Sequence, residues 1–521
     1  METAAENSGT VLRSERIAGG ILPKVLNSFD MVAIFVAIVL FISNSSVVTG
    51  AGAAAFIYWI LGFLTFLIPG AIVTGQLGLM FPGEGSIYVW TTRAFGAFMG
   101  FFAGFCAWWP GVLVMIATGD AVVSLIQQLG SQYGLSLLAE PWQQGLVILL
   151  VIALSCVLSV LRFRVTQNLV NVIFVAYGGA ILLVGLAGLI WLLSGHPAQA
   201  DFSAAHWQLN NTNYTFYGLV ILALLGIEVP LNMGVEIQNT RAITRYLLWG
   251  SVVVMLAYLL GTFGVMMAVP PAIQSQGNPS VVAAAVKYGF GPAGNVLATI
   301  VNLIFIGFFL FNTVVYNYSF GRLLFVSGLD RRLPTMMSKV NRNRVPWVAV
   351  LVQSIISGVL TVITFIIAPF VIQALKPSDL STVVYDVLQA AVTIIWCISM
   401  VFLFIDVIYI RYKYRESFQR VQLAPDWVFY LCAVIGCVAS AFGVAVIFIS
   451  PWTTLINTLA WDLSLVGFAA ISLVAGAVIY FIGQATMRRD VSDEEILAEV
   501  IGSPEDVNPA SDAAGGSSAS A

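Results

Sequence analysis

The stretch ALLGIEVPLNMGVEIQN, residues 223–239, begins like the middle of an apolar helix and then changes character. Glu228 and Pro230 follow the apolar start, with Gly226 and Gly234 on either side of them. A carboxylate and a helix-breaking residue are both costly inside an apolar helix. We therefore expect the helix to be interrupted here, at a place where the interruption is useful.

The sequence around this stretch is that of a membrane protein. Of its residues 59% are hydrophobic and 9% are charged, whereas soluble domains carry roughly 25% charged residues. Long runs contain no Asp, Glu, Lys or Arg, namely residues 31–83, 165–200, 246–286, 288–321 and 345–375. One membrane-spanning helix needs about 20 apolar residues, and these runs lack the alternation of a β-barrel. The composition predicts an all-α protein that crosses the lipid bilayer many times.

We predict twelve transmembrane helices and five regions. The expected helices are 27–50, 54–80, 94–128, 144–161, 168–194, 214–236, 245–269, 288–321, 346–370, 382–410, 427–450 and 460–485. The expected regions are a cytoplasmic N-terminal segment 1–26, a first five-helix repeat 27–194, a second, inverted repeat 214–410, helices 11 and 12 at 427–485, and a disordered acidic cytoplasmic tail 486–521.

The basic residues predict the orientation. If the N-terminus is cytoplasmic and the helices alternate in direction, all 22 Lys and Arg residues except Lys287 and Lys376 fall on the cytoplasmic side, as the positive-inside rule requires. We therefore expect a multi-pass protein of the cell membrane, inner or plasma, with both termini in the cytoplasm.

The C-terminal tail differs in composition from the rest of the chain. From Asp490 onward it carries eight acidic residues and no basic one, which is typical of a disordered, solvated segment. A short helix is expected within it at DEEILAEVIG, residues 493–502. An alternative is a regulatory segment that contacts the basic cytoplasmic loops.

Two of the twelve helices are interrupted, and they lie five helices apart. The first contains ISNSSVVTGAG, residues 42–52, and the sixth contains GIEVPLNMG, residues 226–234. Matching interruptions in two five-helix halves are typical of transporters built from inverted repeats. A helix that breaks inside the membrane exposes free N–H groups, which suit an anion, and free carbonyls, which suit a cation or an ammonium group.

The candidate site residues come from four helices. Asn312 and Tyr316 lie on one face of the eighth helix, and Trp108 lies on the third. The simpler interpretation of these groups is helix-to-helix hydrogen bonding, an interfacial tryptophan and a proline kink with a paired Glu228. The predicted substrate-binding residues are Ser43, Asn44, Ser45, Ser46, Trp108, Gly226, Ile227, Glu228, Asn312 and Tyr316, of which Trp108, Glu228 and Tyr316 are also the predicted coupling or gating residues.

Three segments resemble motifs of one transporter family. They are QLGLMFPGEGSIYVWTTRAFG (76–96), GIEVPLNMGVEIQNTRAITR (226–245) and GRLLFVSGLDRRLPTMMSKVNRNRVP (321–346). Their order and spacing are similar to those of the amino acid–polyamine–organocation transporters, over about residues 20–485. The sixth helix is most similar to that of the bacterial amino acid antiporters of acid resistance.

The resemblance implies a fold and a function. The fold is a LeuT-like 5+5 inverted repeat with broken helices 1 and 6, plus two extra C-terminal helices. The function is secondary active transport of amino acids or related amines by alternating access, as an exchanger or a proton-coupled symporter. No cofactor, metal, nucleic acid or enzymatic activity is implied, the substrate is a small molecule, the proton is the candidate coupling ion, and the oligomeric state is open.

The sequence also departs from the family pattern. Ser43–Ser46 stand where the family has Gly-Ser-Gly-Ile-Phe, Gln76 replaces a usual Glu, and Thr240 replaces a usual Pro. The fifth helix carries no lysine that could act as a proton carrier. The change in the first helix leaves the substrate open, because that loop is expected to bind a carboxylate.

Alternative functions remain open at this point. A sodium-coupled symporter would use hydroxyls such as Thr313 or Ser319 near the first break, and a non-transporting sensor would use the acidic tail as its output. A membrane-embedded enzyme would need clustered His, Asp, Glu or Ser groups, and His196 and His206 share one outer loop instead. The transporter hypothesis assigns to Glu228 the coupling of the two gates or contact with the substrate amine.

Overall fold

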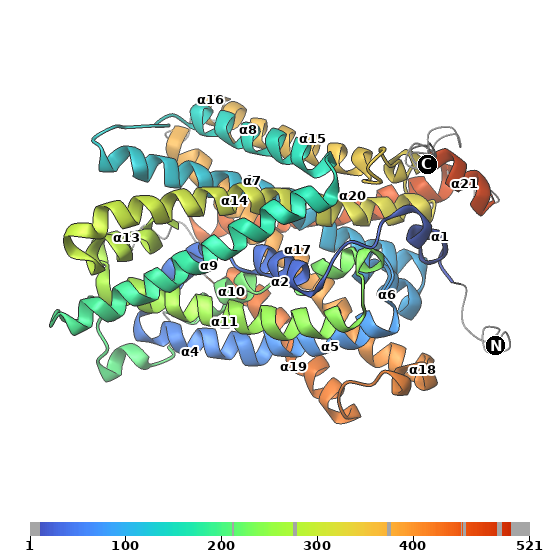
Figure 1. The fold of residues 1–521 in the computed structure, drawn as a ribbon, viewed down its shortest axis with the longest axis horizontal. Coiled ribbons are helices and arrows are strands. Elements are labelled where there is room, and N and C mark those ends of the chain that lie inside the picture. The colour runs from blue at the N-terminus through green and yellow to red at the C-terminus, as the bar shows by residue number, and fades with distance from the viewer. Residues whose placement is uncertain are drawn as a thin grey trace, which may run out of the picture.

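The computed structural model describes residues 11–210, 213–274, 279–371, 377–449, 451, 455–486 and 492–501 as a bundle of helices. Most of the long helices run along the long axis of the bundle (Figure 1). The long helices are α7 (Ala97–Gln132), α8 (Pro141–Val160), α9 (Phe163–Leu193), α11 (Arg241–Ala268), α14 (Gly294–Leu329), α15 (Trp347–Thr361), α17 (Pro377–Lys413), α19 (Asp426–Ile447) and α20 (Thr458–Thr486).

Shorter helices complete the bundle. The segment that leads from the first break is α3 (Ser43–Val48), a 3-10 turn, α4 (Ala55–Gly62), a π turn and α5 (Ile68–Met80). The others are α1 (Arg13–Ile21), α2 (Ser28–Val39), α6 (Ser86–Phe95), α10 (Thr215–Ala223), α12 (Pro271–Gln274), α13 (Pro279–Gly289), α16 (Ala368–Val371), α18 (Arg415–Arg420) and α21 (Asp493–Ile501).

The membrane-spanning prediction is confirmed in its coarse form. Ten helices of the described chain are long and apolar enough to cross a membrane, and one of these runs from Ser43 to Met80 through a kink at Gly52, where φ is +64°. The predicted first and sixth spans are broken into α2 and α3, and into α10 and two 3-10 turns, so neither half reaches spanning length. An all-α, multi-pass protein is therefore observed, while twelve spans and the inverted repeat stay predictions.

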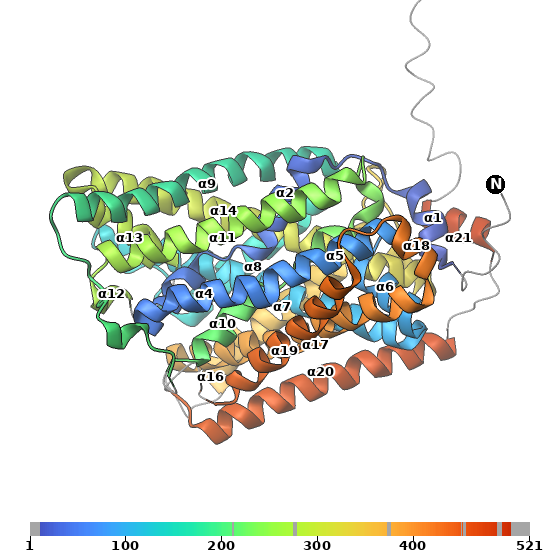
Figure 2. The ribbon, with the colours of Figure 1, turned by 90° about the horizontal axis from the view of Figure 1, so that it is seen from below.

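The structure adds helices between the predicted spans. α6 follows the second span and ends at Phe95, and the next residue, Gly96, has a φ of +93° and leads the chain into α7. α13 lies between the seventh and eighth spans, and α18 lies between the tenth and eleventh. Figure 2 shows α20 along one side of the bundle, where it packs against α17.

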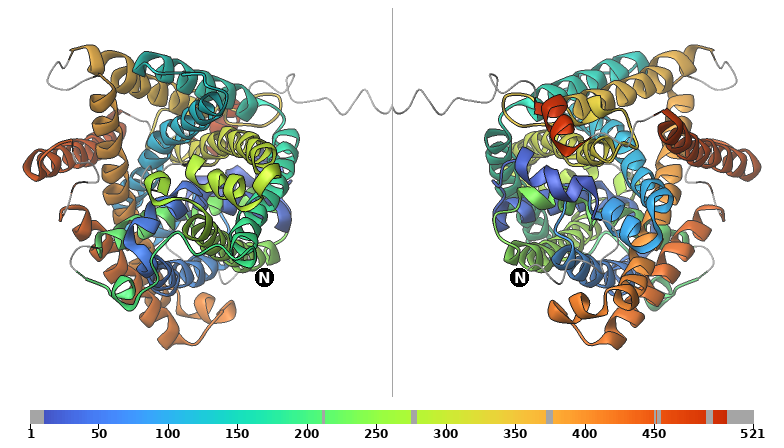
Figure 3. Two further views of the ribbon diagram at one scale, coloured as in Figure 1. Left: turned by 90° about the vertical axis from the view of Figure 1, so that its left-hand side faces the viewer. Right: turned by 90° about the vertical axis from the view of Figure 1, so that its right-hand side faces the viewer.

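The two ends of the bundle differ in charge. One end, here called the α1 end, carries α1, α6, α18 and α21, so both described terminal helices lie together there (Figure 3). The ion pairs of this end include Arg93 with Glu15, Arg164 with Asp30 and Arg411 with Asp426. The other end, here called the α12 end, carries the junctions of α7 with α8 and of α11 with α13.

The short helix predicted at 493–502 is confirmed as α21, and the rest of the tail lies outside the described residues.

Candidate functional site at the two helix breaks

The sixth helix breaks where the sequence predicted. α10 ends at Ala223, and the chain continues through 3-10 turns at Val229–Asn232 and Gly234–Glu236 before α11 begins. Gly226 has φ +97°, and a Cβ built on it would lie 2.5 Å from Ile38 of α2. Only glycine tolerates both this backbone conformation and this close approach. Gly226 therefore lets the two broken helices meet.

Glu228 lies inside the break of the sixth helix. Its side chain is buried, and its Oε1 accepts a 3.1 Å hydrogen bond from Nε1 of Trp396 on α17. Its Oε2 has no hydrogen-bond partner among the described residues. A buried carboxylate oxygen without a donor is costly, so this group is suited to receive a proton or a cationic ligand.

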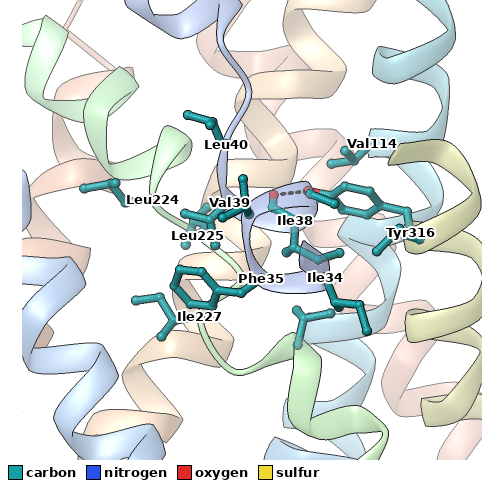
Figure 4. Close-up of a cluster of buried hydrophobic side chains, with 14 of the residues drawn as sticks. Ile34, Phe35, Ile38, Val39, Leu40, Val114, Leu224, Leu225, Ile227 and Tyr316 are labelled. Atoms are coloured by element: carbon teal, nitrogen blue, oxygen red, sulfur yellow. Dashed lines mark hydrogen bonds between the residues drawn. The ribbon is translucent and has the colours of Figure 1, made fainter. Parts of the chain in front are cut away.

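The first helix breaks at Leu40–Ile42, between α2 and α3. Two tyrosine hydroxyls reach the free carbonyls at the end of α2, and Figure 4 shows one of them, that of Tyr316 at Ile38. Tyr316 of α14 donates a 2.6 Å hydrogen bond to the Ile38 carbonyl. Tyr258 of α11 lies 2.8 Å from the Val39 carbonyl, 3.0 Å from the Ala223 carbonyl and 3.0 Å from the Phe41 N–H. Tyr258 thus joins the two breaks.

The position of the first break differs from the prediction. The break was expected within residues 42–52, but Ser43–Val48 are helical and the unwound residues precede them. The hydroxyls of Ser46 and Thr49 donate to the carbonyls three residues earlier, of Ser43 and Ser46, so these two side chains satisfy their hydroxyls within the helix. Ser45 donates to the Tyr258 carbonyl at 3.4 Å, while Ser43 and Asn44 are half-buried.

The eighth helix presents an unpaired amide to the first break. Phe309 packs edge-on against Phe41 at 5.0 Å between ring centres, and Tyr316 reaches Ile38. Asn312 lies between these two residues on the same face of α14, and it is buried with no hydrogen-bond partner on either amide atom among the described residues. Asn312 is therefore available to a polar group of a ligand bound at the break.

Trp108 lies apart from the breaks. Its Nε1 donates to Gln353 Oε1 at 2.9 Å, and Gln353 in turn donates to the Tyr316 carbonyl at 3.3 Å. The Trp108 ring lines an apolar pocket of about 160 Å³. The other residues that line this pocket are Phe101, Gly104, Phe105, Leu323, Leu324, Ser327, Leu333, Met337, Val352, Ile356 and Ile479. The pocket offers almost no polar group, so the breaks are the better site for a charged ligand, and a gating function of Trp108 stays a prediction.

The immediate surroundings of the breaks are apolar. Figure 4 shows Ile34, Phe35, Val114 and Leu225 around the end of α2, with Ile227 next to Phe35. Phe320 stacks on Tyr316 at 5.3 Å and meets Trp396 edge-on at 5.6 Å between ring centres. A ligand at the breaks would place its polar groups on carbonyls, Asn312 and Glu228, and its apolar body on these side chains.

A buried ion cluster lies between the breaks and the α1 end. Arg322 of α14 is fully buried, with Nη2 2.9 Å from Glu236 Oε1 and Nε 3.8 Å from Glu84 Oε1. Glu84 Oε2 accepts from the Val235 N–H at 3.2 Å. Burial, and after it the charge of Glu236, raise the pKa of Glu84 well above its usual value. The cluster ties the loop before α6 to the second break and to α14, which closes this side of the site.

Several of these residues were not singled out from the sequence. Tyr258, Trp396 and Gln353 are ordinary members of apolar helices, and no local pattern marks them. Glu84, Glu236 and Arg322 lie within the family-like motifs, and Arg322 directly follows the charge-free run 288–321. That position was a usable signal, because a charge at the end of such a run must find a partner.

Comparison with known proteins gives a consistent family. A family model described as amino acid permease matches residues 26–471. An uncharacterized transporter of Legionella pneumophila is 24% identical over 353 residues, which cover 65% of this chain and 73% of that protein. A probable agmatine/putrescine antiporter of Lactococcus lactis is 25% identical over 350 residues, covering 64% and 71%. A polyamine transporter of Arabidopsis thaliana is 23% identical over 417 residues, covering 74% and 73%.

Proposed function

The chain belongs to the amino acid permease family, and from this premise we propose that it is a secondary active transporter of amino acids or related amines. It moves its substrate across the plasma membrane by alternating access, as an exchanger or a proton-coupled symporter. Both termini are cytoplasmic in this proposal, so the α1 end faces the cytoplasm. The gathering of arginine ion pairs at that end supports the orientation.

The observation that carries the proposal is the chemistry of the two breaks. Glu228 and the carbonyls of Ile38, Val39 and Ala223 all present negative charge or partial negative charge to one region. Such a region favours a cationic amine. The relatives named for agmatine, putrescine and polyamines support an amine as the substrate class. Tyr258 and Tyr316 are proposed to release carbonyls to the ligand when it binds.

Thermal stabilisation of the purified protein tests this proposal first. A panel of agmatine, putrescine, longer polyamines, γ-aminobutyrate and the common amino acids should contain at least one stabilising ligand. A ligand at 100 times its Kd adds about 2.7 kcal/mol of stability. A complete absence of stabilisation across this panel would contradict an amine as the substrate.

Counterflow in liposomes then tests Glu228. We expect Glu228→Gln to reduce exchange of the stabilising ligand at least about tenfold, since a buried ion pair with the ligand is lost. Glu140→Gln, at the exposed start of α8, is the control and should leave exchange unchanged. Normal exchange by Glu228→Gln at every pH would remove Glu228 from the coupling and amine-binding assignment.

Sodium coupling is the second candidate, and one contact bears on it. The Thr313 hydroxyl donates to the Phe309 carbonyl at 2.9 Å and pairs with Thr118 at 2.7 Å. The Thr313 hydroxyl is therefore already paired. Of the two candidate sodium ligands, Ser319 is the one whose hydroxyl has no partner among the described residues. Transport that is unchanged when choline replaces sodium would exclude sodium coupling. Proton coupling and substrate exchange would then be the remaining mechanisms.

A further inference from the structure

We propose that α21 is an intramolecular latch, which docks across α1 and the loop between α14 and α15 (residues 330–346) and holds the α1 end of the transport pathway closed. This inference rests on the proposed alternating-access function and adds a regulatory element to it. The acidic C-terminal helix is the occupant of a basic and apolar surface that the N-terminal helix and this loop form together.

Charge complementarity fixes the docked position of α21. Arg16 of α1 makes two hydrogen bonds with Asp493, at 3.0 and 3.1 Å, and Arg13 lies 3.7 Å from the same carboxylate. At the other end of α21, Glu499 accepts from Arg331 at 3.1 Å. One short helix therefore binds two separate segments of the chain through opposite charges.

Apolar and backbone contacts add to the ion pairs. Ile496 and Val500, one helical turn apart on α21, are 0% and 2% exposed although the helix lies at the surface of the bundle. The Val340 N–H donates to the Val500 carbonyl at 3.3 Å. The burial of these two side chains shows that α21 is packed on this surface, and Figure 3 shows the helix against the α1 end of the bundle.

The surface under α21 joins parts of the chain that must separate during transport. α1 is bound to the end of α14, because Ser14 donates from its N–H and its hydroxyl to Asp330 at 2.8 and 3.0 Å. α1 leads directly into α2, and the N–H groups of Val25 and Leu26 bind the Glu236 carbonyl at 2.9 Å. Opening this end in alternating access requires the inner half of the first helix to move relative to α14. α21 contacts both α1, which leads into the first helix, and the loop that follows α14, so it must release one of them when this end opens.

Transport rates and hydrogen–deuterium exchange test the latch in the full-length protein. Ile496→Asp places a charge in the buried contact. We expect the initial rate of transport of the stabilising amine to rise about three- to tenfold. Amide exchange at Val25 and Leu26 should rise with it. Glu494→Gln is the control, since Glu494 is exposed on α21 and makes no ion pair among the described residues.

A charge reversal provides a second, independent arm. Arg331→Glu should accelerate transport in the same way, and the double variant Arg331→Glu/Glu499→Arg should return it to the wild-type rate, which a purely structural disturbance would not do. If both single variants increase amide exchange within α21 but leave the transport rate and exchange at Val25 unchanged, the latch is disproved. If the wild type moves no amine, the proposed function fails, whereas amide exchange at Val25 and Leu26 still decides the latch.

Discussion

Gly226 decides how closely the two broken helices approach. Its Cα faces Ile38 of α2 and Trp396 of α17 at distances that leave no room for a methyl group. Its φ of +97° is also outside the range that other residues adopt readily. Backbone conformation and packing therefore demand glycine at this one position for two separate reasons.

Gly226→Ala is expected to destabilise the protein by about 2 kcal/mol or more, because a strained φ and a steric clash add. Thermal unfolding in detergent measures the effect as a lower Tm. Gly467→Ala in α20 is the matched control, since a Cβ there meets nothing within 4 Å. Equal Tm values for the two variants would show that the close approach to Ile38 is not rigid.

Tyr258 acts on both breaks through one hydroxyl. Its ring stacks on Trp59 at 4.1 Å between ring centres, which holds the hydroxyl in place between Val39, Phe41 and Ala223. Each of these backbone groups lacks an intrahelical partner because its helix has ended. One side chain thus stabilises two interruptions that lie far apart in the sequence.

We expect Tyr258→Phe to cost about 1–3 kcal/mol, the usual cost of leaving a buried polar group unpaired. The variant keeps the ring stacking, so the loss isolates the hydroxyl. Tyr133→Phe, at a side chain that is 70% exposed, controls for the substitution itself. A Tm for Tyr258→Phe that matches this control would mean that other groups take over the three backbone contacts.

At the scale of elements, a buried cluster of charged side chains joins the loop before α6 to the second break. This cluster contains more acidic than basic groups. Two carboxylates, Glu84 and Glu236, share the single guanidinium of Arg322. Glu84 Oε1 and Glu236 Oε2 both lack a hydrogen-bond donor among the described residues. One shared proton would satisfy both oxygens and neutralise the cluster, in agreement with the raised pKa of Glu84.

This charge balance predicts a pH dependence of stability. A carboxyl whose pKa is raised on folding contributes stability below its unfolded pKa, and this contribution is lost as the pH rises through the folded pKa. As the pH rises above the ordinary pKa of a glutamate, the Tm of the wild type should therefore fall more steeply than that of Glu84→Gln, which stays neutral. Parallel Tm curves would show that Glu84 does not titrate in this range.

At the scale of the whole molecule, the two ends of the bundle have different tasks. The α1 end gathers both described terminal helices, the buried Arg322 cluster and the ion pairs of Arg93 and Arg164. The path from the breaks to this end is therefore closed by several layers of contacts. Under the proposed transport function, the structure corresponds to a state in which the candidate site is shut toward the α1 end.

The shared location of α1 and α21 at one end of the bundle predicts that both termini lie on the same side of the membrane. Tags at residue 1 and after residue 521 should be reached by an impermeant probe only after right-side-out vesicles are permeabilised. A cysteine at exposed Leu135, between α7 and α8 at the α12 end, should label in intact vesicles. Access to either terminal tag in intact vesicles would contradict a cytoplasmic α1 end.

The sequence by itself determined the class of the protein, the approximate helices, the family and the presence of two interruptions. These follow from local properties, because a bilayer demands long apolar runs and a Gly, Glu and Pro together break one. Glu228 and Gly226 were identified for the same reason, and the short helix at 493–501 follows from its pattern.

Only the tertiary structure decided which groups complete the candidate site and where the first break falls. Tyr258, Trp396 and Arg322 act on residues between 35 and 219 positions away along the chain, and no local pattern encodes such a pairing. The serine-rich run looked like the break, but it is helical and its Ser46 and Thr49 hydroxyls bond to carbonyls of their own helix, so the interruption lies at Leu40–Ile42 instead. Side-chain partners depend on packing, and packing is settled by the whole bundle at once.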